Sequence, residues 1–221
     1  MTVSVPRASG RRRGSFTTGA AFVREFIRNP STTAAIAPSS RKLAGRMIEG
    51  LDFASMRSIV EFGPGSGVFT RAVLERLPRG WLAGEGGKGR FIAIEFSAGM
   101  ATLVREQFPR VTVVNGSAEH VQSICADNGI GPGQLDAVVS GLGWASFPPE
   151  LTTRILEATW NTLRPGGQFR TFAYHLGLLM PGARHFRAEA QRLFGEVSAS
   201  RGVWANLPPA FVYRCTKANP K

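Results

Sequence analysis

The sequence predicts an α/β fold: a doubly wound, mostly parallel sheet of seven strands with helices on both faces. Short apolar segments typical of buried strands alternate with longer segments whose apolar residues recur at helical spacing. Glycine and proline separate these segments, as expected for turns. The chain has 221 residues, of which 43% are hydrophobic, so it can bury the core of one such domain.

The regular part of the pattern begins with a buried strand, and a glycine-rich turn connects this strand to a helix. Pro109 ends a later helix, and the segment 129–133 forms a turn. Because strands and helices alternate, we expect parallel β-α-β units. Strands are expected at 58–62, 90–95, 111–114, 135–140, 167–174, 194–201 and 210–216, and helices at 68–76, 98–107, 118–127, 149–163 and 183–193.

The segment before the first strand differs in composition and divides the chain into three parts. Residues 1–15 are rich in serine, glycine and arginine, and we expect them to form a flexible basic arm. Residues 16–51 are expected to form a helical segment that serves as a membrane contact or lid. Residues 52–221 then form the α/β domain.

Two helices are expected in the N-terminal helical segment. The first, 20–28, ends before Pro30, because proline disfavours a helical conformation in the residue before it. The second, 41–51, is expected to be capped by Ser39 or Ser40. The first helix carries Phe22, Val23, Phe26 and Ile27 on one face, and Arg24, Glu25 and Arg28 on the other.

The formal net charge of +12 favours anionic partners, either a membrane surface or nucleic acid. The charge is concentrated near the N-terminus, where Glu25 is the single acid within residues 1–46. A solvated, disordered tail is the alternative interpretation of residues 1–14. No apolar stretch approaches the roughly 20 residues that span a bilayer, and the arginine cluster is not followed by a secretory signal. We therefore expect a cytoplasmic protein.

A glycine-rich turn follows the first strand, in the sequence Glu61-Phe62-Gly63-Pro64-Gly65-Ser66-Gly67. Glycine lets the backbone turn sharply and approach a ligand closely. In an open α/β sheet, ligands bind beyond the carboxyl ends of the strands, where the strand order reverses. This turn therefore predicts a cofactor site.

Three observations indicate which cofactor binds. Glu95 ends the second strand, where a carboxylate can accept both hydroxyls of an adenosine ribose; a solvated acid is the alternative. The glycines of the turn lack the Gly-x-Gly-x-x-Gly spacing of dinucleotide sites. Glu61 suits an amino-acid ammonium better than a phosphate. These observations favour S-adenosylmethionine. No metal is expected, because the two cysteines, Cys125 and Cys215, lack metal-ligand spacing.

Four motifs connect the chain with a known family. The glycine turn and Leu163-Arg164-Pro165-Gly166-Gly167 are generic to methyltransferases. The segments Pro38-Ser39-Ser40-Arg41 and Trp204-Ala205-Asn206-Leu207-Pro208-Pro209-Ala210 are more specific. On these segments the chain resembles class I methyltransferases and, more narrowly, the bacterial phospholipid N-methyltransferases, which convert phosphatidylethanolamine to phosphatidylcholine. The resemblance runs from about Phe22 to Lys217.

This resemblance implies a Rossmann-like class I methyltransferase with an N-terminal helical extension. It also implies S-adenosylmethionine-dependent methylation of the amine of a phospholipid headgroup, or of a related amino lipid such as ornithine lipid. The implied cofactor-binding residues are Glu61, Phe62, Gly63, Pro64, Gly65, Gly67, Glu95, Phe96, Ser117, Ala118 and Ser140. The residues expected at the substrate or membrane are Phe22, Arg24, Phe26, Arg28, Ser39, Ser40, Arg41 and Trp144.

The chain departs from the family pattern in two places. The family commonly has Gly-Asp-Ala after the third strand, where the acid meets the adenine amino group. This sequence has Asn115-Gly116-Ser117-Ala118, so Ser117 or a backbone group would have to take that role. The glycine-rich segment 81–88 is also longer than usual.

Three residues are candidates for contact with the methyl acceptor. An attacking amine must be neutral, so the site needs a group that accepts its proton. Tyr174 can orient the amine and His175 can take the proton, although both can equally be packing groups at a strand end. Trp144 can present an aromatic face to a methylated ammonium, or can be a core residue.

A lipid substrate requires contact with a membrane. The helix 20–28 and the basic arm before it suit an interfacial anchor on an anionic surface; packing of this helix on the sheet is the alternative. We therefore expect a protein that is peripheral on the inner face of the membrane, and no protein partner is implied.

The main competing hypothesis is an RNA adenine N6-methyltransferase, which would also favour positive charge. Such enzymes usually carry an Asn-x-Pro-aromatic motif after the fourth strand, to hold a flipped base. This chain has Ser140-Gly141-Leu142-Gly143-Trp144 there, without Asn or Pro. We also expect no counterpart of the C-terminal helical domain that such enzymes carry. Nucleic acid is therefore the less favoured partner. A third hypothesis is a cofactor-binding scaffold without activity, supported only by Ser117.

Overall fold

The computed structural model describes residues 40–83, 86–194 and 196–219. The basic arm, the helix expected at 20–28 and Ser39 lie outside these residues. The expectations for Phe22, Arg24, Phe26 and Arg28 therefore remain predictions.

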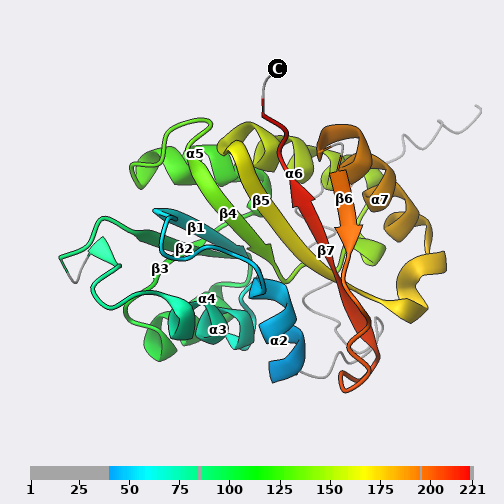
Figure 1. The fold of residues 1–221 in the computed structure, drawn as a ribbon, viewed down its shortest axis with the longest axis horizontal. Coiled ribbons are helices and arrows are strands. Elements are labelled where there is room, and N and C mark those ends of the chain that lie inside the picture. Colours follow the sequence, from blue (N-terminus) through cyan, green and yellow to red (C-terminus); the bar gives the residue numbers. More distant parts are fainter. Residues whose placement is uncertain (1–39, 84–85, 195, 220–221) are drawn as a thin grey trace, which may run out of the picture.

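A seven-stranded sheet forms the centre of the molecule, with the strand order β3-β2-β1-β4-β5-β7-β6 (Figure 1). The first five strands are parallel, whereas β7 is antiparallel to β5 and β6 is antiparallel to β7. The strands are β1 (Ser58–Phe62), β2 (Arg90–Glu95), β3 (Thr112–Asn115), β4 (Leu135–Ser140), β5 (Leu163–Tyr174), β6 (Glu196–Ala199) and β7 (Ala210–Thr216). The prediction of a doubly wound, mostly parallel sheet is confirmed.

Helices cover both faces of this sheet because its strands are apolar on both sides. In β1, Ile59 packs with the helices α2, α3 and α4, whereas Val60 and Phe62 pack with α5, α6 and α7 (Figure 1). The α-helices are α2 (Arg41–Ile48), α3 (Val68–Arg76), α4 (Ala98–Gln107), α5 (Val121–Asp127), α6 (Pro149–Thr162) and α7 (Pro181–Phe194). Short 3-10 helices are η2 (Ala118–His120), η3 (Trp144–Ser146) and η4 (His175–Leu179).

Seven elements have bounds that differ from those expected. Those of β3, α5, α6 and α7 differ by one to three residues at an end, and residues 118–120, expected in α5, form η2 instead. The other three are α2, β5 and β6. Helix α2 ends at Ile48 rather than at residue 51, because Glu49 is extended and Gly50 has a φ of 77°. Strand β5 begins at Leu163 rather than at residue 167, since Leu163 already pairs with Leu135 of β4. Strand β6 covers a shorter range than 194–201, because Phe194 still belongs to α7, where it stacks on Phe169.

A buried carboxylate fixes the amino ends of three neighbouring strands. Asp136 of β4 accepts hydrogen bonds from the backbone amides of Arg57 and Ser58, at 2.7 and 2.9 Å. Its other oxygen pairs with Arg164 of β5 at 2.6 Å. Charge-assisted hydrogen bonds of this kind are stronger than neutral ones. The register of β1, β4 and β5 is thereby set at the end of the sheet away from the cofactor turn.

The order of the strands reverses between β1 and β4, and this position defines the crevice for ligands. The backbones approach closely here, because the amide of Gly141 donates to the carbonyl of Phe62 at 2.7 Å. A Cβ at Gly141 would lie 2.6 Å from the carbonyl oxygen of Gly63. Only glycine fits this contact, so the end of β4 lies directly against the glycine turn.

Two glycine substitutions test how tightly the turn is packed. Gly67 belongs to the turn, and Gly50, which follows α2, serves as the comparison because the two have similar φ values of 75° and 77°. A Cβ at Gly67 would lie 2.2 Å from the ring of Phe108, whereas a Cβ at Gly50 would meet no atom within 4 Å. We expect Gly50→Ala to lower the free energy of unfolding by about 1–2 kcal/mol. Gly67→Ala should lower it by a further ~1–3 kcal/mol, because it overpacks the site. Chemical denaturation measures both losses of unfolding free energy, and equal losses would show that the ring of Phe108 moves aside without cost.

Candidate functional site

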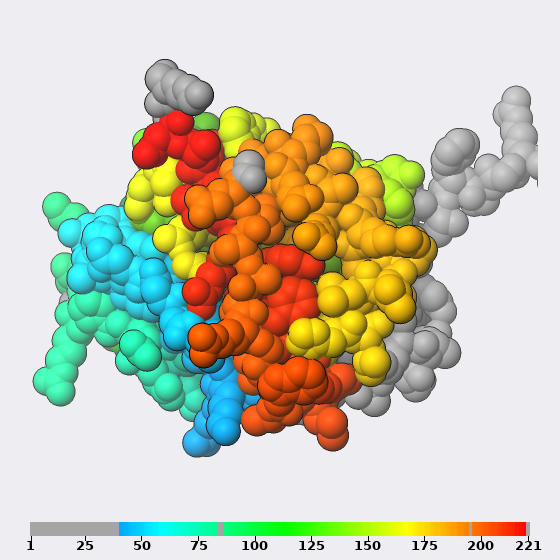
Figure 2. Space-filling model, turned by 45° about the vertical axis from the view of Figure 1, so that its right-hand side comes forward, coloured from blue at the N-terminus to red at the C-terminus, as the bar shows by residue number. Residues whose placement is uncertain are grey.

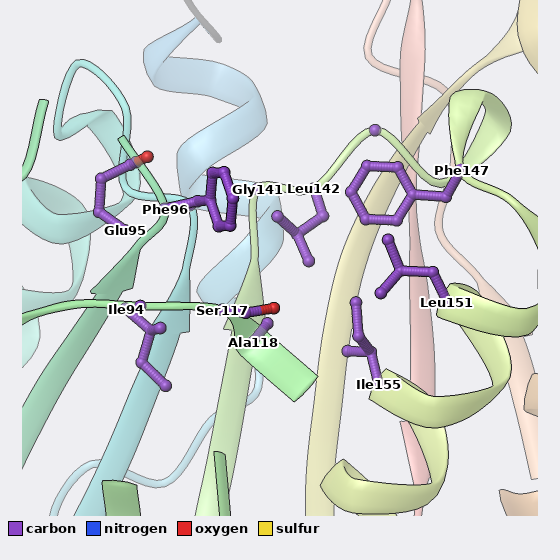
Figure 3. A pocket seen from close by; sticks show the side chains of 13 residues that line it. Ile94, Glu95, Phe96, Ser117, Ala118, Gly141, Leu142, Phe147, Leu151 and Ile155 are labelled. Atoms are coloured by element: carbon purple, nitrogen blue, oxygen red, sulfur yellow. The ribbon is translucent and has the colours of Figure 1, made fainter. Parts of the chain in front are cut away.

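A pocket opens at the carboxyl ends of the strands, beside the glycine turn (Figure 3). Its volume of about 160 Å³ is smaller than the roughly 300–1,000 Å³ of typical ligand pockets, so it accounts for only part of a cofactor. The described residues that line it are Gly63, Ile94, Glu95, Phe96, Gly116, Ser117, Ala118, Gly141, Leu142, Gly143, Phe147, Leu151 and Ile155.

The pocket is apolar on its walls and polar near one end. Leu151 and Ile155 lie one turn apart on α6 and form one wall with Phe147, while Phe96 and Leu142 lie opposite (Figure 3). Apolar walls with a few polar groups are typical of small-molecule and cofactor sites. The lining therefore suits the adenine of S-adenosylmethionine.

Glu95 is the carboxylate at the edge of this pocket, and its position is fixed by the backbone. One oxygen accepts from the amide of Ser97 at 2.9 Å, and the other accepts from the amide of Gly65 at 3.3 Å. Each carboxylate oxygen has a further lone pair that can accept a ribose hydroxyl. The acid therefore fits the ribose role expected from its place at the end of β2.

The glycine turn itself presents backbone rather than side chains. Gly63, Gly65 and Gly67 all have positive φ, and the amide of Gly67 donates to the carbonyl of Pro64 at 2.8 Å. Gly63 lines the pocket, whereas Pro64, Gly65 and Gly67 are not among its described lining residues. Since the pocket is large enough for only part of the cofactor, these three residues remain predicted contacts for its other end.

Glu61 is fully buried beneath the turn and does not line the pocket. Its Oε2 accepts a hydrogen bond from the hydroxyl of Thr70 at 2.7 Å, and its Oε1 has no partner among the described residues. Burial raises the pKa of Glu61 to about 8, and the nearby Glu95 adds to this effect. The carboxyl therefore holds its proton at neutral pH in the absence of a cation, and its contact with a ligand ammonium remains a prediction.

Ser117 lines the pocket at the position where the resemblance implies an acid. Its hydroxyl lies 3.1 Å from Oε1 of Glu119, to which it donates, and the other oxygen of Glu119 pairs with Arg154 at 3.0 Å. The Ser117 oxygen also accepts from the backbone amide of Glu119 at 3.5 Å and so caps η2, and its remaining lone pair can accept a hydrogen bond from a ligand. Sequence reasoning missed this pairing of Ser117 with Glu119.

The other expected cofactor residues have different positions. Phe96 and Ala118 line the pocket, whereas the side chains of Phe62 and Ser140 are fully buried at the ends of their strands and are not found among its lining residues. Ser140 accepts from the amide of Leu142 at 3.3 Å, so it shapes the loop that does line the pocket. Residues that the sequence analysis missed are Ile94, Gly116, Gly141, Leu142, Gly143, Phe147, Leu151 and Ile155.

Tyr174 and His175 follow one another at the end of β5 but contact different layers of the structure. The ring of Tyr174 packs against Phe172 at 5.2 Å, and the imidazole of His175 packs against Phe211 at 5.1 Å and stacks on Trp204 at 5.5 Å. Tyr174 Oη and His175 Nε2 are buried without a hydrogen-bond partner in the described part of the chain. Both are absent from the described lining of the pocket.

Trp144 is enclosed in the core. It is 4% exposed, and its indole nitrogen donates to the hydroxyl of Thr171 at 2.8 Å. The rings of Phe147, Phe169 and Phe186 lie within 6.0 Å of its ring. Of the two interpretations, this geometry supports the core residue rather than an aromatic face presented to a methylated ammonium.

The two specific sequence motifs meet in space. The backbone amide of Ser40 donates to the side chain of Asn206 at 2.8 Å, and the Ser40 hydroxyl caps α2 by accepting from the amide of Leu43 at 3.2 Å. Asn206 in turn donates to the carbonyl of Pro208 at 2.8 Å. Arg41 is exposed at the first position of α2. The loop between β6 and β7 is thereby attached to the start of α2.

Comparison with known proteins supports a single family. A family model described as a methyltransferase domain matches residues 59–167. The chain is 30% identical over 197 residues to an ornithine lipid N-methyltransferase of Singulisphaera acidiphila, covering 88% of this chain and 93% of that protein. The chain belongs to the class I S-adenosylmethionine-dependent methyltransferases. S-adenosylmethionine is the cofactor of this methyltransferase, as predicted.

Solved structures agree with this assignment at the level of the fold. An O-methyltransferase from Bacillus cereus in complex with SAH has a TM-score of 0.60 at 17% identity, over 89% of this chain and 91% of that one. An S-adenosylmethionine-dependent O-methyltransferase from Thermotoga maritima has a TM-score of 0.58 at 16% identity, over 92% of this chain and 72% of that one. The predicted Rossmann-like methyltransferase fold is confirmed.

Removal of the Glu95 carboxylate should weaken cofactor binding. We expect Glu95→Ala to raise the Kd for S-adenosylmethionine by about 10- to 100-fold, because hydrogen bonds to a charged group contribute ~1.5–3 kcal/mol. Isothermal titration calorimetry measures the change, and Glu75→Ala, which removes an exposed acid of α3, is the matched control. Unchanged affinity in Glu95→Ala would place the ribose elsewhere.

Ser117 and Glu119 should act on cofactor binding as a pair. We expect Ser117→Ala to raise the Kd for S-adenosylmethionine by about 3- to 10-fold, the loss of one neutral hydrogen bond. Glu119→Gln should have a smaller effect alone and almost none in the Ser117→Ala background. A double-mutant cycle by calorimetry tests this, and strictly additive effects would contradict the pairing.

The raised pKa of Glu61 predicts a pH-dependent stability. The pKa of this carboxyl is about 8 in the folded chain, against an ordinary value of 4.5, so the folded chain holds the proton more tightly. The protonated carboxyl therefore contributes to the free energy of unfolding fully below the ordinary pKa of 4.5, and this contribution is lost as pH rises through the folded-state pKa of about 8. Glu61→Gln does not titrate, so its free energy of unfolding should increase relative to that of the wild type as pH rises across this range. Guanidinium unfolding at several pH values measures the difference, and a constant difference would mean that Glu61 is ionised throughout.

Proposed function

We propose that this methyltransferase transfers methyl groups from S-adenosylmethionine to the amine of a membrane amino lipid. The observation that carries the proposal is the relationship to the ornithine lipid N-methyltransferase, which extends over 88% of this chain. Ornithine lipid and phosphatidylethanolamine, with its methylated intermediates, are the two acceptor classes to be tested. Both present an amine at the surface of a bilayer.

In this proposal, His175 and Tyr174 have separate roles toward the attacking amine. When bound, S-adenosylmethionine supplies an electrophilic methyl group, and a lipid amine must be neutral to attack it. His175 carries a buried Nε2 without a partner among the described residues, so it can accept the proton that the amine loses. Burial raises the pKa of Tyr174 to about 12, so its phenol stays neutral. Its oxygen can orient the amine by accepting a hydrogen bond from an N–H, which leaves the nitrogen lone pair free to attack.

The proposed setting is the inner surface of the membrane. Within the described residues no helix is long and apolar enough to cross a bilayer. A peripheral protein that meets lipid at an anionic surface agrees with the net charge of +12. The role of the helix expected at 20–28 as an anchor belongs to this proposal.

The acceptor is identified directly by labelling. Purified protein with radiolabelled S-adenosylmethionine is offered total bacterial lipid and total RNA in separate reactions. Label in the organic phase supports the lipid proposal, and thin-layer chromatography against ornithine lipid and phosphatidylethanolamine standards identifies the headgroup. Label in RNA alone would instead support the competing hypothesis of an RNA adenine N6-methyltransferase.

Substitution of Tyr174 separates a substrate contact from a structural role. Tyr174→Phe keeps the ring that packs on Phe172 and removes only a hydroxyl that has no partner in the described part of the chain. We expect unchanged thermal stability and unchanged cofactor affinity, with kcat lowered by about 10-fold or more. His175→Gln should lower kcat by about 100-fold if His175 accepts the proton. Unaltered kcat in both variants would remove these residues from the mechanism.

A further inference from the structure

Several large apolar side chains are exposed together at one edge of the molecule. In η4 and the residue that follows it, Leu176 is 79% exposed, Leu179 86% and Met180 42%. In the loop between β6 and β7, Trp204 is 76% exposed and Leu207 79%. We call these five residues the apolar rim. Single exposed apolar residues are ordinary on protein surfaces, but a cluster marks a surface for interaction.

The two segments of the rim lie side by side. The ring of Trp204 stacks on His175, the first residue of η4, with ring centroids 5.5 Å apart and planes inclined by 7°. The backbone amide of His175 donates to the carbonyl of Pro209 at 3.1 Å. In Figure 2 the yellow segment near residue 178 adjoins the dark orange segment near residue 205 at the lower edge of the molecule. The rim is therefore one continuous surface.

The rim is held outward by a well-anchored loop. Asn206, between Trp204 and Leu207, is 2% exposed and hydrogen bonds to Ser40 of the α2 cap. Val203 pairs with Ala210 through two backbone hydrogen bonds, at 2.6 and 3.4 Å. Because the loop buries its polar residue while its largest apolar side chains face solvent, their exposure is a property of the folded loop.

The charges around the rim have one sign. The segments 175–188 and 199–210 contain no aspartate or glutamate, and they contain Arg184, Arg187 and Arg201. All three arginines are exposed. Arginine side chains beside apolar groups can place their charge at the lipid phosphates while their aliphatic stems and the apolar groups enter the interface. Tryptophan also prefers the interface between headgroups and acyl chains. This composition complements an anionic bilayer surface rather than a water-soluble protein of like charge.

The rim also lies next to the residues assigned to the acceptor. Helix η4 begins directly after Tyr174, at the carboxyl end of β5, and the parallel strands that border the cofactor pocket end at this same side of the sheet. We propose that the apolar rim inserts into the interface of an anionic bilayer and brings lipid headgroups to the acceptor side of the site. This inference deepens the proposed function and rests on it for the choice of lipid as partner.

Tryptophan fluorescence tests the proposal without any methylation reaction. All four tryptophans lie in described segments: Trp81 and Trp144 are buried, Trp160 is half-buried, and Trp204 is exposed. Vesicles of phosphatidylethanolamine and phosphatidylglycerol with brominated acyl chains should quench the wild-type fluorescence. The quenching should disappear in Trp204→Phe, which keeps an aromatic ring at this position. Vesicle-dependent quenching that persists in Trp204→Phe, or none in wild type, would overturn the proposal.

Vesicle sedimentation provides the second measurement. We expect the double variant Leu176→Ser with Leu207→Ser to bind the same vesicles about 10-fold or more weakly, because each leucine loses its apolar contact with the interface. Leu103→Ser is the matched control, since Leu103 is 56% exposed but lies on α4, away from the rim. Circular dichroism verifies the fold of each variant. Equal binding by the double variant and the control would contradict the proposal.

Two further outcomes separate this inference from the proposed function and from self-association. If wild-type protein methylates detergent-dispersed lipid while Trp204 stays unquenched on vesicles, the function stands and the rim proposal fails. If Trp204 is quenched but no lipid accepts label, the rim stands and the lipid acceptor fails. A dimer by light scattering that becomes a monomer in the double variant, without vesicle binding, would assign the rim to a second copy of the chain.

Discussion

The contact between the ends of β1 and β4 is the constraint on which the site depends. Two backbones meet there without any side chain between them. The amide of Gly141 donates to the carbonyl of Phe62, and a Cβ on Gly141 would collide with the carbonyl oxygen of Gly63. This contact holds the glycine turn against the loop that follows β4. The pocket lies along this junction, so main-chain packing fixes the part that Gly63 and Gly141 line, and the side chains of Phe147, Leu151 and Ile155 form a wall beside it.

The polar groups of the site are positioned by short local contacts. Glu95 is fixed by two backbone amides, and Ser117 is oriented by Glu119. By contrast, Tyr174 and His175 keep polar atoms without partners among the described residues. The cofactor side of the site is therefore preorganised, whereas the side proposed for the methyl acceptor keeps two polar atoms, Tyr174 Oη and His175 Nε2, whose hydrogen-bonding capacity is unused among the described residues.

Much of the fold was predictable because it depends on local patterns. The bounds of β1, β2, β4, β7, α3 and α4 agree with those predicted, since buried strands and helices that bury one face leave clear periodicities. The cofactor pocket was predictable only in part, since five of its thirteen described lining residues were expected. Leu151 and Ile155 were recognisable as one face of a helix, but sequence does not tell which cavity that face closes. The exposed leucines of η4 could not be distinguished from core residues, because apolarity alone carries no information about burial.

The pairing of Ser117 with Glu119 also constrains how this chain can diverge from its relatives. An aspartate at position 117, as in the family pattern, would bring a second carboxylate to within hydrogen-bonding distance of Glu119, and like charges at that distance repel. We therefore expect the family residue to be tolerated better once Glu119 has lost its charge, although Arg154 already offsets part of that charge. On this expectation the two positions are epistatic, so that the effect of a substitution at one depends on the residue at the other.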